Sequence, residues 1–230
     1  MGFRILGVFG FCIFGFYATC QPVDSLRVAA LSAVLNDSER SAQGHTLVHQ
    51  GVEVAPLPKN IKGTPYLWED FESGTITYAG LIYGNTLMQF DAVHQRVLAQ
   101  HPFGSFPIAL VQSKVTAFEA SGRRFMSFDL PGGPSGFYQV LNAGRVTVLA
   151  RRRKELRERV SGNEVERFYH SMDQLFLLKE GVLHRIQTHK QLWALLGDQK
   201  SAIKKIWKDQ GLSFRHQKEQ ALIEAAASYE

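Results

Sequence analysis

The feature that most constrains the fold is an alternation of apolar and polar residues with a period of two, which runs from Gly74 to about Gln187. β-Branched and aromatic residues recur along it between short turn signals, as expected of strands that bury one face. Glycine or a short polar pair separates two alternating runs around His94-Gln95, at Ala143-Gly144 and at Glu180-Gly181, and we expect hairpin turns there. The pattern predicts an antiparallel meander of roughly nine to eleven short strands.

A sheet with so many strands must curl or close, because flat open sheets of this size are unfavourable. The last residues change to the helical period of 3.6. Thr188 and Gln191 form a capping-box pattern before the apolar residues of Leu192–Leu196, and Asp198 is placed to cap a second helix. We therefore expect an α+β, mainly β fold: a curled sheet or partly closed barrel, followed by two or three short C-terminal helices that pack on the sheet.

The amino terminus has the pattern of a secretory signal. One positive charge, Arg4, precedes the apolar run Ile5–Ala18, which is shorter than the roughly 20 apolar residues that span a bilayer. Cleavage after Cys20 would leave Gln21 as the first mature residue and remove both cysteines of the chain. The alternative is a lipoprotein in which Cys20 is acylated. Either route predicts an exported protein, in the periplasm or at the cell surface, whose mature chain has no transmembrane helix.

The segments that follow suggest four regions. Residues 1–20 form the signal and residues 21–62 an extension or linker, since prolines and polar, turn-forming residues dominate the latter half of that range. Leu26–Leu35 could form a short helix within it. Residues 63–187 form the β domain and residues 188–230 the helical segment. No cysteine follows residue 20, so disulfides and thiolate chemistry are excluded from the mature chain.

The positive charge of the chain is concentrated in one segment. Residues 151–159 hold six basic and two acidic side chains, and elsewhere, outside the signal, 19 basic residues face 19 acidic ones. Nucleic-acid binders usually spread a basic face over the fold, so we do not expect nucleic acid as a partner. One hypothesis is that this segment contacts an anionic envelope component. The favoured hypothesis is that it forms a solvated strand end and loop, whose charges prevent the strand edge from pairing with another chain. The candidate contact residues are Arg151, Arg152, Arg153, Lys154, Arg157 and Arg159.

No motif assigns catalytic, cofactor-binding or metal-binding residues. His45 and His49 have the i, i+4 spacing of a zinc helix but lie in a loop-like segment. The segment Pro131–Phe137 lacks the glycine that a serine nucleophile motif needs two residues after Ser135. The aromatic residues of the strands suit a packed core, although a curved aromatic sheet could also hold an apolar ligand. We expect no cofactor, and we do not favour an enzyme.

Three segments, "KGTPYLWEDFESGTITYAG", "GFYQVLNAGRVTVLARR" and "KQLWALLGDQKSAIKKIWKDQGLSF", resemble a family of uncharacterised exported proteins of Gram-negative bacteria. The resemblance covers roughly residues 62–230 and implies a small β-rich domain before a lysine-rich helical tail, with no assigned activity. The leading hypothesis is a cell-envelope protein that acts by binding, as an interaction or structural module, to an unknown envelope protein or anionic component. The alternatives are a carrier of a lipid-like ligand, which requires an apolar cavity, and an enzyme, which requires a cleft where histidines and carboxylates meet.

Overall fold

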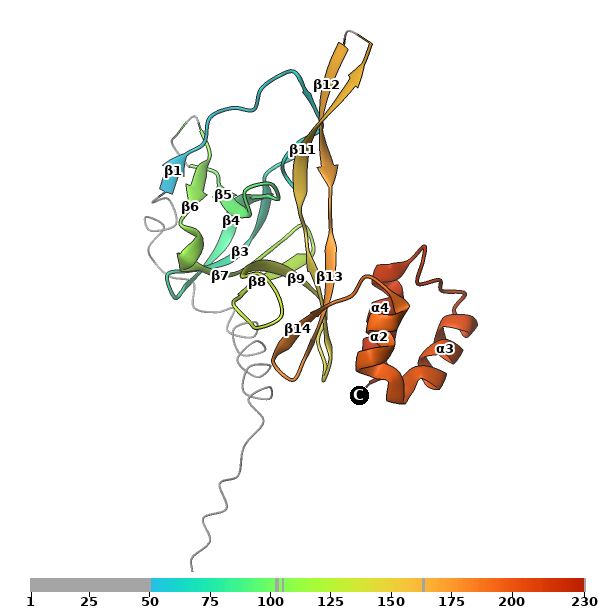
Figure 1. The fold of residues 1–230 in the computed structure, drawn as a ribbon. Helices are drawn as coiled ribbons and strands as arrows, with labels where there is room; N and C mark the ends of the chain where they lie inside the picture. Colours follow the sequence, from blue (N-terminus) through green and yellow to red (C-terminus); the bar gives the residue numbers. More distant parts are fainter. Residues whose placement is uncertain (1–50, 102–103, 105, 163, 230) are drawn as a thin grey trace, which may run out of the picture.

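The structure, a computed structural model, describes residues 51–101, 104, 106–162 and 164–229. The predicted signal and the short helix predicted at Leu26–Leu35 lie outside these residues. The described part of the chain contains fourteen strands in two sheets, followed by three α-helices (Figure 1). The prediction of a mainly β fold, with a large antiparallel sheet and a helical C-terminal end, is confirmed.

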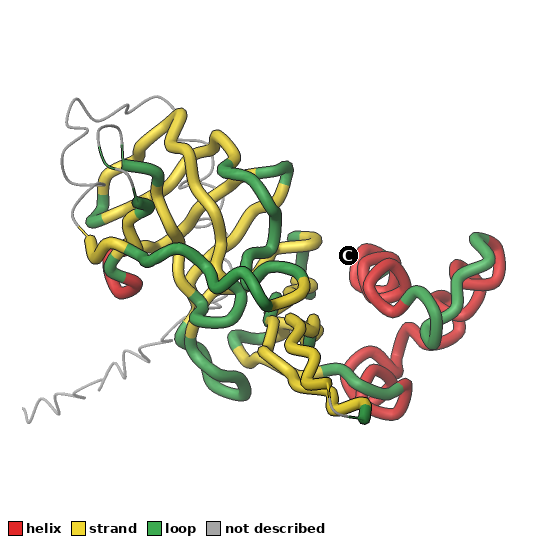
Figure 2. Tube along the Cα trace, turned by 90° about the horizontal axis from the view of Figure 1, so that it is seen from above, coloured by secondary structure: helices red, strands yellow, loops and turns green. Residues whose placement is uncertain are grey.

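The larger sheet has eleven strands in the order β1-β6-β5-β4-β3-β7-β8-β9-β10-β13-β14. It curves but does not close, so β1 and β14 remain its edges (Figure 2). Its strands are β1 (Gly51–Glu53), β3 (Glu72–Tyr78), β4 (Leu81–Asp91), β5 (Arg96–Ala99), β6 (Ile108–Leu110), β7 (Val115–Ala120), β8 (Arg123–Phe128), β9 (Gly136–Asn142), β10 (Thr147–Arg151), β13 (Gln174–Lys179) and β14 (Val182–Arg185).

The three predicted hairpin turns are confirmed, since they join β4 to β5, β9 to β10 and β13 to β14. In the last of these, Glu180 and Gly181 both have positive φ angles, of 52° and 76°. This is the backbone of a two-residue type I′ turn, whose twist matches that of the flanking strands. Ser121 and Gly122 make an equivalent turn between β7 and β8.

One face of the curved sheet is filled by aromatic rings. Phe118 and Phe125, on neighbouring strands, stack with their ring centroids 4.7 Å apart. Phe90 packs against both of these rings, with centroid distances of 5.4 and 5.3 Å, and Phe137 packs against Phe118 at 5.4 Å. All four side chains are at most 2% exposed. The aromatic residues of the strands therefore form a packed core at this place.

The second core lies between the sheet and the C-terminal helices α2 (His189–Leu196), α3 (Lys200–Asp209) and α4 (Lys218–Ala227). Residues of β10 and β13 contribute Val148 and Leu177, and the helices contribute Leu192, Ile203 and Leu222. The Trp207 Nε1–H donates to the Ala221 carbonyl at 2.9 Å and joins α3 to α4. These short helices gain their stability from this packing.

The predicted capping box is confirmed, because the Thr188 side chain accepts a hydrogen bond from the Gln191 backbone N–H at the start of α2. The prediction that Asp198 caps the next helix is wrong. Gly197 keeps a right-handed conformation, with φ −66°, so the chain continues from α2 through the 3-10 turn Gly197–Gln199 into α3 without a break.

The smaller sheet consists of β11 (Lys154–Ser161), β12 (Glu164–Ser171) and the two-residue strand β2 (Ile61–Lys62), in the order β11-β12-β2. The chain passes from β10 into β11 and returns from β12 into β13, so that the β11-β12 hairpin extends beyond the larger sheet (Figure 1). β1 and β2 fall within residues 21–62, which the sequence predicted to be a linker. Strands of three and two residues are too short to produce a periodic signal.

Candidate functional site

The basic segment 151–159 crosses the junction between β10 and the β11-β12 hairpin. At its centre Arg152, whose side chain is only 12% exposed, forms ion pairs with Glu219 of α4 at 2.9 Å and with Asp173 at 2.6 Å. Its Nε–H also donates to the Gln139 side chain at 2.7 Å. Burial alone would lower the pKa of Arg152, but the hydrogen bonds that it donates to Glu219 and Asp173 raise the pKa above its usual value. Arg152 therefore joins the sheet to the last helix.

Two neighbours of Arg152 are also turned towards the protein. The Lys154 ammonium group donates to the backbone carbonyls of Thr64, at 3.0 Å, and of Tyr66. Arg151 donates to the Ser135 carbonyl at 3.4 Å. Burial lowers the pKa of both side chains, the Lys154 amine and the Arg151 guanidinium. Both cations thus support the base of the hairpin.

The remaining cations lie on the hairpin or at its start. Arg157 pairs with Glu155, and Arg159 lies 3.8 Å from Glu166 and 5.2 Å from the centre of the Phe168 ring. Of the six candidate contact residues, only Arg153 has a side chain without a hydrogen-bond or ion-pair partner in the described part of the chain. The structure therefore brings the six residues together, and it pairs three of them with carboxylates and two with backbone carbonyls. Contact with a polyanion stays a prediction.

The hairpin also presents an exposed apolar face, which the charge pattern concealed. Val160 and Val165 are directly opposite each other across the two strands, and their side chains are 70% and 57% exposed. Leu156, four residues before Val160 and so on the same face of β11, is 46% exposed. We call Leu156, Val160 and Val165 the hairpin apolar face.

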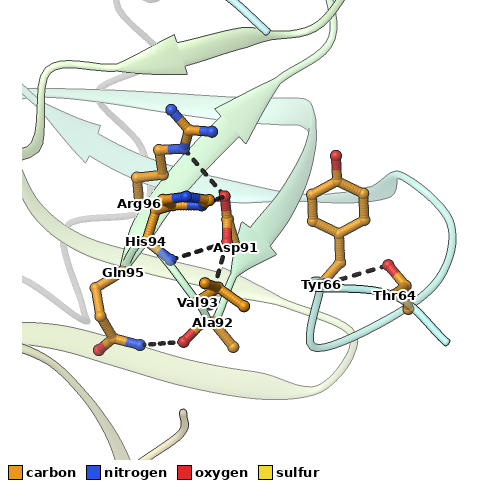
Figure 3. Close-up of polar contacts among 8 residues, drawn as sticks. All are labelled: Thr64, Tyr66, Asp91, Ala92, Val93, His94, Gln95 and Arg96. Carbon is orange, nitrogen blue, oxygen red and sulfur yellow. Dashed lines mark hydrogen bonds and ion pairs between the residues drawn. The ribbon is translucent and has the colours of Figure 1, made fainter. Parts of the chain in front are cut away.

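A second candidate site lies where β4 turns into β5, around Asp91 (Figure 3). The Asp91 carboxylate is 2% exposed and accepts four hydrogen bonds from three residues. The backbone N–H groups of Val93 and His94 donate to Oδ1 at 3.1 and 3.0 Å, and His94 Nδ1 and Arg96 Nε donate to Oδ2 at 2.7 and 3.1 Å. These contacts use the acceptor positions of the carboxylate, so Asp91 fixes the side chains of His94 and Arg96.

The turn itself is held to the rest of the protein by backbone contacts. Asp91 pairs with Tyr66 through an isolated antiparallel bridge, and the Ala92 carbonyl accepts from the Lys154 N–H at 3.1 Å. The backbone of Gln95 has the positive φ, 57°, that the turn requires, and its side chain donates to the Arg152 carbonyl at 2.8 Å. The turn is therefore packed against the base of the hairpin.

A pocket of about 380 Å³ opens beside this turn. Its walls come from four parts of the chain that lie far apart in sequence: Glu53–Pro58, Pro65-Tyr66, the turn itself and Tyr169 of β12. Burial, and after it the charge of Asp91, raises the pKa of Tyr66 and of Tyr169. Both phenols are therefore neutral hydroxyl groups at physiological pH.

The pocket contains one pair of side chains with acid–base chemistry, His94 and the Asp91 carboxylate that holds it. Its lining, within the described residues, includes an Asp-His pair but no serine, threonine or cysteine that the pair could activate as a nucleophile. Across the part of the chain that the structure describes, no group of three or more histidine, cysteine, aspartate or glutamate side chains is placed to hold a metal ion. His45 and His49 lie outside the described residues.

Comparison of the chain with protein-family models, curated proteins and solved structures found no match. Sequence reasoning placed a turn at His94-Gln95 but missed the site. The signal that could have found it is the spacing Asp91-x-x-His94-x-Arg96, in which an aspartate before a turn can bond the backbone two and three residues ahead.

Proposed function

We propose that this chain is an exported cell-envelope protein that acts by binding another protein, and that the hairpin apolar face is the contact surface. The observation that carries the proposal is the position of Leu156, Val160 and Val165 on one face of a hairpin that extends beyond the larger sheet (Figure 1). Single exposed apolar residues are normal, but adjacent ones rimmed by charges are typical of interaction surfaces. Val160 and Val165 are adjacent in this way, and the ion pair between Arg167 and Glu158 borders them on the same face, between them and Leu156.

A protein partner accounts for the hairpin better than an anionic envelope component does. Arg157 and Arg159 are each paired with a carboxylate of the same hairpin, and Arg152 with carboxylates elsewhere. A polyanion would have to displace these internal partners, whereas a protein can bury the apolar side chains without doing so. The alternative of a lipid carrier is disfavoured because aromatic rings fill the core of the curved sheet.

Export is the part of the proposal that rests on residues 1–20. Mass spectrometry of the protein extracted from its own cells gives the mature mass directly. A chain that begins at Gln21 supports cleavage, and a chain that begins with acylated Cys20 supports the lipoprotein alternative. An intact Met1 in the cytoplasm would contradict export.

The contact surface can be tested by placing a photo-crosslinking residue at Val160 in living cells. We expect a discrete crosslinked protein whose yield falls when Leu156→Thr and Val165→Thr are introduced, because these changes keep strand propensity but remove apolar surface. Leu81, the first residue of β4, is 41% exposed and is the matched control position. Equal crosslinking from Leu81, or an undiminished yield in the double variant, would contradict the proposal.

A further inference from the structure

We propose that the pocket beside Asp91 binds a carboxylated sugar of the uronate type, with its carboxylate on Arg96 and a hydroxyl group on His94. This inference goes beyond the proposed function, because it concerns another surface and needs no protein partner. Its test can therefore fail while the hairpin contact holds, and the reverse is also true.

The first step is that Asp91 prepares two side chains for a ligand without contacting the ligand itself. Its carboxylate is 2% exposed, and its two oxygens already accept four hydrogen bonds. Side chains held in this way lose little conformational freedom when they bind, which favours affinity. Asp91 is thus a positioning residue.

Arg96 supplies the site for the carboxylate. It donates only its Nε–H to Asp91, and its two terminal nitrogens point away from that carboxylate (Figure 3). Within the described residues these two nitrogens have no hydrogen-bond partner. A pair of parallel N–H groups matches the two oxygens of a carboxylate, and such charge-assisted pairs are the stronger hydrogen bonds of proteins.

His94 supplies an acceptor for a hydroxyl group. Its Nδ1 faces an Asp91 oxygen at 2.7 Å and must carry the hydrogen of that bond, since a carboxylate can only accept. In the neutral ring the lone pair is then on Nε2, on the far side of the ring from Asp91. The side chain is 62% exposed and lines the pocket, so this nitrogen is accessible to a ligand.

The walls fit a sugar ring. Tyr66 and Tyr169 offer flat faces with neutral hydroxyl groups at their edges, and Pro56 and Pro58 add apolar surface. In Figure 3 the hydroxyl end of Tyr66 and the terminal nitrogens of Arg96 point to the same side of the turn. A sugar ring combines apolar C–H faces with a rim of hydroxyl groups, and so matches both kinds of wall.

The size and the charge of the pocket restrict the class of ligand further. The pocket of about 380 Å³ falls within the range of small-molecule sites. Glu53 also lines it, and its negative charge repels a doubly charged phosphate more strongly than a single carboxylate. One carboxylate among several hydroxyl groups satisfies both limits, whether the sugar is free or is one residue of an acidic polysaccharide.

Isothermal titration calorimetry of the purified, exported protein tests this directly. The probes are D-galacturonate and D-glucuronate, with D-galactose and D-glucose as neutral counterparts, and a short oligogalacturonate. We expect millimolar binding of at least one uronate, with its neutral counterpart about tenfold weaker or more, since a hydrogen bond to a charged group contributes at least that factor. Tighter binding of the oligogalacturonate than of the monosaccharide would identify a polysaccharide as the source, and equal affinity a free sugar.

The variants locate the site. Arg96→Gln should weaken uronate binding about tenfold or more, and Arg96→Lys should restore part of it, since lysine keeps the charge but not the paired N–H groups. Arg124→Gln, at an exposed arginine that pairs with Glu119, is the matched control and should bind as the wild type does. A thermal melt shows that each variant is folded. The proposal is overturned if no uronate binds, if the neutral sugars bind equally well, or if folded Arg96→Gln binds unchanged.

Discussion

Replacing Arg152 by alanine should separate the C-terminal helices from the sheet at one point and lower the free energy of unfolding by about 2 to 3 kcal/mol. The side chain is 12% exposed and links three elements of the fold: Gln139 on β9, Asp173 before β13 and Glu219 at the start of α4. Alanine removes all of these hydrogen bonds together. No other described residue makes ion pairs to both the sheet region and α4.

The magnitude follows from how far each partner is exposed. Breaking a fully buried ion pair costs about 3 to 5 kcal/mol because the remaining charge stays unpaired. Glu219 and Asp173 are 41% and 37% exposed, so water can solvate them once Arg152 is gone, and the cost is lower. It still exceeds the value of about 1 kcal/mol or less for a surface pair, because the guanidinium itself is buried.

The assay is chemical denaturation of Arg152→Ala, with Arg124→Ala as the control for an exposed pair. Arg124 and Glu119 are 40% and 50% exposed, so that variant should lose less than about 1 kcal/mol. A cycle with Glu219→Gln should show coupling between Arg152 and Glu219 that the control pair lacks. If the two arginine variants were equally stable, the reasoning from burial would be refuted.

Three further predictions concern the core, a turn and the tyrosines. Phe118→Ala should cost about 3 to 5 kcal/mol in denaturation, whereas Phe106→Ala, at a side chain that is 40% exposed, should cost much less. Gly181→Ala should cost about 1 kcal/mol because φ is 76° there, while Gly84→Ala, without positive φ, should be nearly neutral or stabilising. Burial, and after it the charge of Asp91, raises the pKa of Tyr66 and of Tyr169 above the usual value of 10.0. The stability that their neutral hydroxyl groups contribute is therefore fully present below pH 10, and it is lost as the pH rises through the pKa of the folded state. Unfolding of the Tyr66→Phe, Tyr169→Phe variant should therefore depend less on pH above 10 than that of the wild type; equal slopes would contradict this.

The sequence predicted the elements whose signals are local. Each of these signals involves residues only a few positions apart: the alternation along β4 and β7, the glycine turn at Gly181 and the capping box at Thr188. The strand β11 was missed because charges occupy both of its faces, which removes the apolar alternation that identifies a half-buried strand. Its partner β12 shows why it forms: eight residue pairs join the two strands in continuous register.

The candidate site could not be predicted from the sequence for a different reason. Glu53, Tyr66, Asp91 and Tyr169 reach one pocket from positions up to 116 residues apart, and nothing local in the chain relates them. Only the Asp91-His94-Arg96 group is local, and the turn preference of His94-Gln95 explains its backbone without any reference to a ligand.

The basic segment connects the two proposed surfaces with the helical end. Arg152 holds α4 by its side chain and the Asp91 turn by its carbonyl. Two residues later, Lys154 holds that turn by its N–H and the segment Thr64–Tyr66 by its ammonium group. The same stretch begins β11, which carries the hairpin apolar face. Its charges are thus positioned to fix the hairpin, the pocket and the helices relative to one another. This is a sufficient physical reason for cations to gather at one point in a chain that is otherwise nearly balanced in charge.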